Sequence, residues 1–143
     1  MDFQEAFSRN FPDKYTPETI EEYILPERVK NIFLNTSPED MGNMVLYSKP
    51  GRGKTSIVKL YAELHDMRYH VIPCSLNSSI AEIRNEVPNF CTEYEEDETK
   101  RCMVIFDEAE GLYNNKTVLN ALKPLIEQYQ ENTIFIFTTN DPS

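Results

Sequence analysis

From residue 43 onward, short apolar runs alternate with stretches of helical periodicity. The apolar runs are residues 44–47, 68–76 (interrupted by Pro73), 102–106 and 133–138. Apolar residues recur at helical spacing over residues 55–65, 79–94 and 118–129. Strands that are apolar at successive positions are buried on both faces, and strand–helix alternation is typical of parallel sheets. The pattern predicts an α/β fold with a mainly parallel sheet between helical layers, with ligands bound beyond the carboxyl ends of the strands.

The first 40 residues are more polar and hold four of the nine prolines. Thr16 and Pro17 form a helix-start signal, and Pro26 is predicted to open a second helix that runs to about Asn35. Pro88 falls inside a predicted helix and is expected to break or kink it, and Pro124 is expected to kink another. A chain of 143 residues has room for one domain, so we predict an N-terminal segment over 1–40 and a core over 41–143.

Composition narrows the class of protein. The net charge of −10 opposes broad binding to nucleic acid or to anionic membrane. The three cysteines include no CxxC pair, which indicates reduced thiols in an intracellular protein. The first residues lack a basic start followed by an apolar run, and no window reaches 18 uncharged apolar residues. We therefore expect a cytoplasmic protein, or one in the cytoplasm of whatever cell hosts it, with no membrane partner.

The loop over residues 48–56, Ser-Lys-Pro-Gly-Arg-Gly-Lys-Thr-Ser, follows the first predicted strand and opens a helix. Glycine lets backbone amides approach a phosphate, and a helix N-terminus attracts anions. Lys54 would reach the β and γ phosphates of a nucleotide, and the Thr55 hydroxyl would bind Mg²⁺. Residues 41–62 carry a charge of +4 and no acid. Ser48 replaces the first glycine of G-x-x-x-x-G-K-[ST], so an exposed basic turn is the alternative interpretation.

Acidic and polar side chains follow two later strands. Asp107 and Glu108 end the run over 102–106, which we expect beside the strand that precedes the loop. Asp107 would bind Mg²⁺ through water, and Glu108 would orient or deprotonate an attacking water. Asn140 ends the last strand and would face the γ-phosphate, although it could simply close the strand. Glu110 is expected to be a solvated acid.

Together these three elements resemble the Walker A, Walker B and sensor 1 motifs of the AAA+ ATPases. The segment over residues 14–26, Lys-Tyr-Thr-Pro-Glu-Thr-Ile-Glu-Glu-Tyr-Ile-Leu-Pro, resembles the opening segment of sliding-clamp loader ATPase subunits. Within that group it looks most like the large subunit of tailed-phage clamp loaders. The resemblance covers about residues 12–140.

The resemblance implies a role for each matching position. The adenine pocket would be lined by Lys14, Tyr15, Ile24 and Leu25, and the phosphate loop would comprise Gly51, Arg52, Gly53, Lys54, Thr55 and Ser56. Asp107 and Glu108 match the magnesium-binding and water-activating acids, Asn140 matches the sensor, and Arg101 matches a polar switch residue tied to DNA sensing. The cofactors implied are ATP and Mg²⁺.

In clamp loaders the polypeptide continues past the sensor with an arginine finger, another central strand, a helical lid and a collar. The expected fold is therefore a three-layer P-loop core that stops before the last strand and the lid, with strand 44–47 as an unprotected edge. The implied function is the ATP-hydrolysing lobe of a subunit that loads a sliding clamp onto primer–template DNA. Other loader subunits, the clamp and the DNA would be its partners, and hydrolysis by this chain alone would be weak.

Other functions stay open at this point. Another AAA+ role, as a helicase loader or branch-migration motor, would use the same motifs. A non-catalytic nucleotide-binding scaffold is compatible with Ser48, and a small-molecule P-loop kinase is disfavoured because the Asp-Glu pair suits attack by water. His65, His70 and Cys74 match no familiar zinc spacing.

Overall fold

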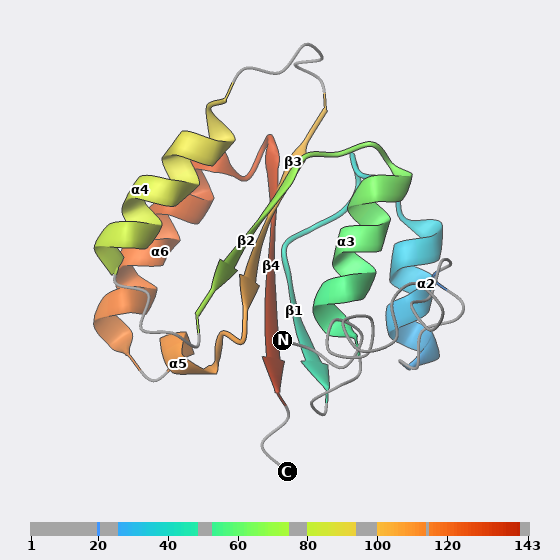
Figure 1. Ribbon diagram of the computed structural model, residues 1–143, viewed down its shortest axis with the longest axis horizontal. Helices are drawn as coiled ribbons and strands as arrows, with labels where there is room; N and C mark the ends of the chain where they lie inside the picture. Colours follow the sequence, from blue (N-terminus) through green and yellow to red (C-terminus); the bar gives the residue numbers. More distant parts are fainter. Residues whose placement is uncertain are drawn as a thin grey trace, which may run out of the picture.

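In the part of the chain that the structure describes, four parallel strands form a central sheet. The computed structural model describes residues 20, 26–48, 53–74, 80–93, 100–113 and 115–140. The strands are β1 (Met44–Ser48), β2 (Tyr69–Pro73), β3 (Cys102–Asp107) and β4 (Thr133–Asn140). They lie in the order β1-β4-β3-β2, and every neighbouring pair is parallel. All four carboxyl ends therefore meet at one edge of the sheet, which is the lower edge in Figure 1.

Helices cover both faces of this sheet. Helices α2 (Glu27–Asn35) and α3 (Lys54–Leu64) lie on one face, and α4 (Ile80–Cys91) and α6 (Lys116–Tyr129) lie on the other (Figure 1). The short helix α5 (Glu110–Tyr113) follows β3 directly. The three-layer α/β architecture predicted from strand–helix alternation is confirmed, and the helix predicted from Pro26 to about Asn35 is confirmed as α2.

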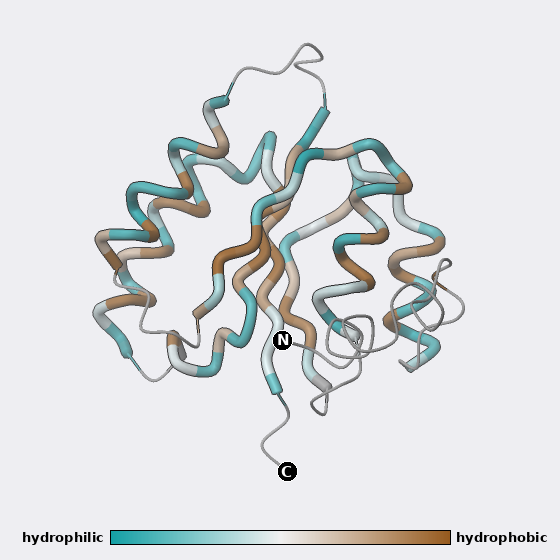
Figure 2. The backbone as a smooth tube through the Cα atoms, in the orientation of Figure 1, coloured by the Kyte–Doolittle hydropathy of each residue, from teal (hydrophilic) through white to brown (hydrophobic). Residues whose placement is uncertain are grey.

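The sheet separates two apolar clusters. On the α3 side, Phe33, Ile57, Val58 and Tyr61 pack with Ile134 and other strand residues, and Ile20 joins the same cluster. On the α4 side, Ile83, Val87 and Leu122 pack against Val104, Phe106 and Phe135. Figure 2 shows the hydrophobic strands enclosed between helices of mixed polarity. Because β3 is buried along residues 102–106, its polar end at Asp107 has a fixed position.

The structure corrects the predicted neighbour of β3. We expected β3 beside β1, but β4 pairs with both and lies between them. Asp107 still reaches Thr55 at the start of α3, because α3 packs on β3 as well as on β1 and so crosses the face of β4.

Strand β1 lies at an edge of the described sheet, as the family resemblance implied. It is not a buried strand on both faces, however. Leu46 is buried against α3, whereas Val45 and Tyr47, on the opposite face, are 40% and 60% exposed. The apolar run alone could not reveal this, because exposure depends on what lies beside the strand.

The prediction that Pro88 breaks its helix is wrong, whereas a kink at Pro88 or Pro124 stays a prediction. Helix α4 runs without a break through Pro88, and α6 runs through Pro124. Each helix buries an apolar stripe on the sheet, which includes Ile83, Val87 and Phe90 in α4. Burial of these side chains compensates for the backbone hydrogen bond that proline removes. None of the described helices is long and apolar enough to span a membrane.

Candidate functional site

Three segments distant in the sequence meet at the carboxyl edge of the sheet. They are the start of α3, the end of β3 with the turn after it, and the end of β4 (Figure 1). Hydrogen bonds between side chains of these segments join residues 31 to 86 positions apart. The end of the predicted phosphate loop at the start of α3, the acidic strand end and the predicted sensor therefore lie together.

The start of α3 is capped by a glycine. Gly53 caps the helix with φ of 77°, in the left-handed region that glycine adopts without strain. No side chain caps this end, and the first helical hydrogen bond runs from the Ile57 amide to the Gly53 carbonyl at 2.9 Å. The amides ahead of that bond lie at the positive end of the helix dipole, where an anion is stabilised.

Lys54 and Asn140 contact each other directly. Lys54 is only 7% exposed, and its Nζ donates to Oδ1 of Asn140 at 3.1 Å. A buried ammonium group needs hydrogen-bonding partners to offset its desolvation. The contact brings the predicted phosphate lysine and the predicted sensor together.

Two hydroxyl groups converge on one carboxylate oxygen. The hydroxyls of Thr55 and Thr138 both donate to Oδ1 of Asp107, the second at 2.7 Å. Thr55 and Asp107 together offer hard oxygen donors, the ligand type that Mg²⁺ prefers, and Mg²⁺ commonly takes one or two protein ligands besides phosphate and water. The donor set therefore fits the implied cation. In the described part of the chain, no group of three or more His, Cys, Asp or Glu side chains is placed to hold a metal.

The acids at this edge raise the pKa of a neighbouring thiol. Burial, and then the negative charges of Asp107, Glu110 and Glu108, raise the pKa of Cys74 to about 12. The Cys74 amide also donates to the Asp107 carbonyl at 2.9 Å. The thiol of Cys74 therefore stays protonated beside the acidic end of β3.

Glu108 occupies a strained turn in which the chain leaves the sheet. Its φ is 53°, in the left-handed region uncommon for a residue with a side chain. The Glu108 amide donates to Oγ1 of Thr138 at 3.1 Å, and the next amide, of Ala109, donates to the Thr138 carbonyl at 2.8 Å. Thr138 therefore holds both Asp107 and Glu108 in place.

Sequence reasoning missed Thr138 and misjudged Glu110. Thr138 precedes Asn140 by two residues, so both side chains lie on the same face of β4, and that spacing could have indicated it. Glu110 is not a solvated acid. It is half-buried, and its Oε1 accepts the backbone N–H of Asn140.

Arg101 lies at the opposite, amino end of the sheet. Its guanidinium donates to the carbonyls of Pro38, Met41, Gln130 and Thr133 at 2.6–3.3 Å. These contacts fix the turns that lead into β1 and β4. The DNA-sensing role implied by the resemblance is not tested by these contacts and stays a prediction.

Some predicted site residues lie outside the described residues. These are Lys14, Tyr15, Ile24 and Leu25 of the expected adenine pocket, and Gly51 and Arg52 of the loop. Ser56 is described as a half-buried residue in the first turn of α3.

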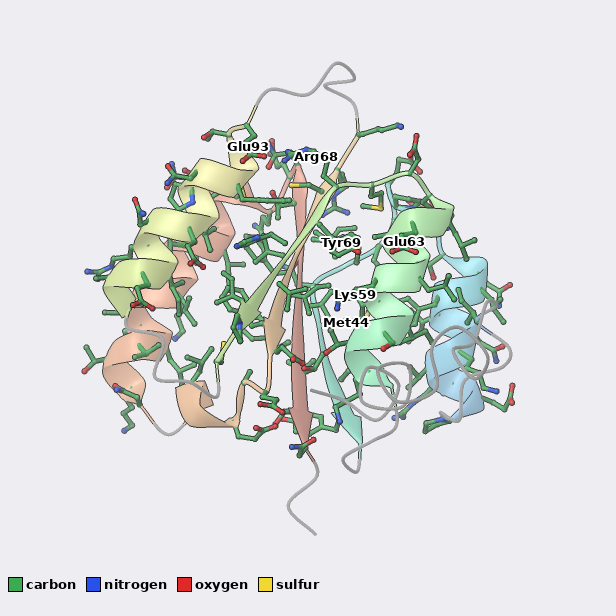
Figure 3. All side chains as sticks on the ribbon, viewed as in Figure 1. Met44, Lys59, Glu63, Arg68, Tyr69 and Glu93 are labelled. Carbon is green, nitrogen blue, oxygen red and sulfur yellow. The ribbon has the colours of Figure 1, made fainter. Side chains whose placement is uncertain are left out.

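A cavity of about 490 Å³ lies away from this site. It is lined by residues 67–70 at the start of β2 and by Glu86, Asn89, Phe90 and Glu93 at the end of α4. Arg68 fills part of it, with Nη1 3.0 Å from Oε2 of Glu93 and Cζ 4.6 Å from the centre of the Phe90 ring. Figure 3 shows Arg68 and Glu93 near the amino ends of the strands, with Tyr69 and Glu63 reaching toward each other below them. The cavity is therefore separate from the carboxyl-edge site.

Three features define the class of the protein. The sheet is parallel with strand order β1-β4-β3-β2, a Gly-Lys-Thr sequence starts the helix after β1, and an Asp-Glu pair stands at the end of β3. Together they define a P-loop nucleotide-binding core. The chain belongs to the AAA family: residues 44–143 match the "ATPase family associated with various cellular activities".

The relatives of this chain include replication factor C subunits. The chain is 31% identical over 134 residues to replication factor C subunit 3 of Saccharomyces cerevisiae, covering 90% of this chain and 39% of that protein. It is 30% identical over 141 residues to subunit 5 of Homo sapiens, covering 92% and 41%. A putative small subunit of Acanthamoeba polyphaga mimivirus is 27% identical over 142 residues, covering 90% and 39%. The chain thus spans about two fifths of the length of these relatives.

Proposed function

We propose that this chain binds MgATP and hydrolyses it as the ATPase lobe of a clamp-loader subunit. The proposal rests on the hydrogen bonds at the carboxyl edge of the sheet, where Lys54 contacts Asn140 and Thr55 contacts Asp107. Membership in the AAA family supports nucleotide hydrolysis. Similarity to replication factor C subunits supports the clamp-loader role.

Each described side chain has a task in this reaction. Lys54 would bind the β and γ phosphates, and Asn140 would hold the Lys54 ammonium and face the γ-phosphate. Glu108 would orient or deprotonate the water that attacks in line, and the hydroxyl of Thr138 keeps the Glu108 backbone in place. Thr55 and Asp107 would hold Mg²⁺, which when bound offsets the charge that develops on the phosphate oxygens.

The partners belong to the same proposal. We propose a hetero-oligomeric ring with other loader subunits, which acts on a sliding clamp and primer–template DNA inside the cell. A neighbouring subunit would supply an arginine to the transferring phosphate, so turnover by the chain alone is expected to be low. The likeness of residues 14–26 to the large subunit of tailed-phage loaders stays a prediction within this proposal, as does the adenine pocket of Lys14, Tyr15, Ile24 and Leu25.

Binding and hydrolysis of ATP can be measured separately. Lys54→Ala is expected to weaken binding of a fluorescent ATP analogue by about 10²-fold, because it removes the buried charge that meets the phosphates. Glu108→Gln is expected to keep binding while it lowers turnover by about 10²-fold or more. Turnover is measured with and without the other loader subunits, a sliding clamp and primed DNA. Glu127→Gln, an exposed change on α6, is the control.

The outcomes separate the candidate functions. Stimulation of turnover by the clamp and primed DNA supports the loader, whereas turnover that ignores both favours another AAA+ role. Nucleotide binding without turnover in the full assembly would identify a scaffold subunit. If Lys54→Ala binds nucleotide as tightly as the unmodified chain, the site itself is wrong.

A further inference from the structure

We propose that Glu110 is a positioning residue, whose carboxylate holds the backbone amide of Asn140 and thereby the side chain that contacts Lys54. Its expected effect on turnover rests on the proposed ATPase function. Its effect on the Asn140 amide does not.

The need for Glu110 arises where β3 leaves the sheet. In the turn after β3, the Ala109 amide still donates to the Thr138 carbonyl of β4 at 2.8 Å. In a parallel ladder the next amide of β4 on that side is two residues on, at Asn140. The chain leaves β3 in the turn that contains Glu108, whose φ is positive, and the Ala109 carbonyl accepts the Leu112 amide at 2.9 Å instead of an amide of β4. The backbone carbonyl that would accept the Asn140 amide in a continued strand is replaced by Oε1 of Glu110.

This contact lies one step from the predicted phosphate lysine. Asn140 is the last residue of β4 and pairs only with Ser48 of β1 in the strand register. Its Oδ1 accepts from Nζ of Lys54 at 3.1 Å. Holding its amide therefore limits where its side chain, and the ammonium of Lys54, can lie. Glu110 thus acts on Lys54 through Asn140, whose backbone it holds and whose side chain contacts the ammonium.

The side chain must provide an acceptor at a given reach from the start of α5. Glutamine keeps an acceptor oxygen at the same distance and removes the charge, aspartate keeps the charge and shortens the reach by one methylene, and alanine removes the acceptor. If the hydrogen bond to Asn140 is what matters, glutamine should preserve function while aspartate and alanine should not. A purely electrostatic role would give the reverse order for glutamine and aspartate.

The first experiment reads the hydrogen bond itself. Hydrogen exchange of the Asn140 backbone amide is measured by NMR on the full chain and its variants, without nucleotide. We expect protection in the unmodified chain and in Glu110→Gln, and at least about tenfold faster exchange in Glu110→Asp and Glu110→Ala. Unchanged exchange in both Glu110→Asp and Glu110→Ala overturns the proposal. If Glu110→Ala does not fold, the aspartate and glutamine variants alone decide.

The second experiment reads the consequence for catalysis. We expect about tenfold lower kcat for MgATP in Glu110→Asp, with KM changed much less, and rescue in Glu110→Gln. In an Asn140→Ala background, Glu110→Asp should add little, because the two residues act through one contact. Additive losses, or a glutamine variant as slow as the aspartate one, overturn the proposal. If the unmodified chain hydrolyses no ATP, the proposed function fails, and the exchange result still decides the role of Glu110.

Discussion

At the scale of single residues, the polar groups of the site form hydrogen bonds with one another. Thr138 is 1% exposed, and its hydroxyl both donates to Asp107 and accepts from the Glu108 amide. A hydroxyl that uses its donor and an acceptor in this way cannot rotate without losing one contact. The two acids of the proposed reaction are thus oriented by a neutral side chain on the adjacent strand.

Replacing this hydroxyl should affect both stability and turnover. Thr138→Val keeps the shape but leaves the Glu108 amide without its acceptor and removes one donor from Asp107. We expect a loss of about 1–2 kcal/mol in the free energy of unfolding, measured by urea denaturation, and slower ATP turnover. Thr138→Ser, which keeps the hydroxyl, should restore most of the turnover. A valine variant as active and as stable as the unmodified chain would show that Thr138 does not hold the acids.

At the scale of secondary-structure elements, Arg101 joins the amino ends of three strands. It precedes β3 and donates to carbonyls in the turns before β1 and before β4. Its Nε is buried without a hydrogen-bond partner in the described structure, and burial lowers the pKa of its guanidinium. Four carbonyl contacts from one planar group set the relative position of β1, β3 and β4 at the end opposite the site.

Lysine should not replace Arg101, although it keeps the charge. A single ammonium cannot reach carbonyls in two separate turns, so we expect Arg101→Lys to lose about 2–3 kcal/mol of unfolding free energy, and Arg101→Met somewhat more. Urea denaturation of both variants measures this. Arg84→Lys, an exposed change on α4, is the matched control. An Arg101→Lys variant within about 0.5 kcal/mol of the unmodified chain would contradict the proposed fixing of the turns.

At the scale of the whole molecule, folding raises the pKa values of two buried side chains, Tyr61 and Cys74. Tyr61, on α3, is buried and donates to the Thr36 carbonyl at 2.7 Å, and burial, with the charge of Glu39, raises its pKa to about 12. The pKa of Cys74, at the end of β2, is also raised to about 12. Their ordinary values are 10.0 and 9.0. The folded chain therefore keeps both protons at a pH where the unfolded chain releases them.

This difference makes folding stability depend on alkaline pH. Both groups are neutral in either state below about pH 8, so their contribution is fully present there. As the pH rises from about 9 toward 12, the unfolded chain loses these protons first, and the free energy of unfolding falls. Urea denaturation between pH 8 and 11 measures the decline, which should be shallower above pH 10 in Tyr61→Phe. A stability that is constant over this range, or a slope unaffected by Tyr61→Phe, would contradict the expected linkage.

The sequence by itself determined the features that depend on a few neighbouring residues. Gly53 and Lys54 predict a phosphate-binding helix start, because turn geometry and the chemistry of a helix N-terminus are local. The apolar run before Asp107 predicts a buried strand by its composition. Strand–helix alternation predicted the three layers for the same reason. Helix continuity through Pro88 was not predictable locally, because packing on the sheet decides it.

Only the tertiary structure decided how these pieces meet. It placed β4 between β1 and β3, left Val45 and Tyr47 exposed at an edge, and joined Thr138 to Asp107 and Glu110 to Asn140. Each of these contacts joins segments about 30 residues apart, so no local pattern encodes it. Glu110 reads as a solvated acid in the sequence because its partner, a backbone amide exposed when β3 turns away, exists only in the folded sheet.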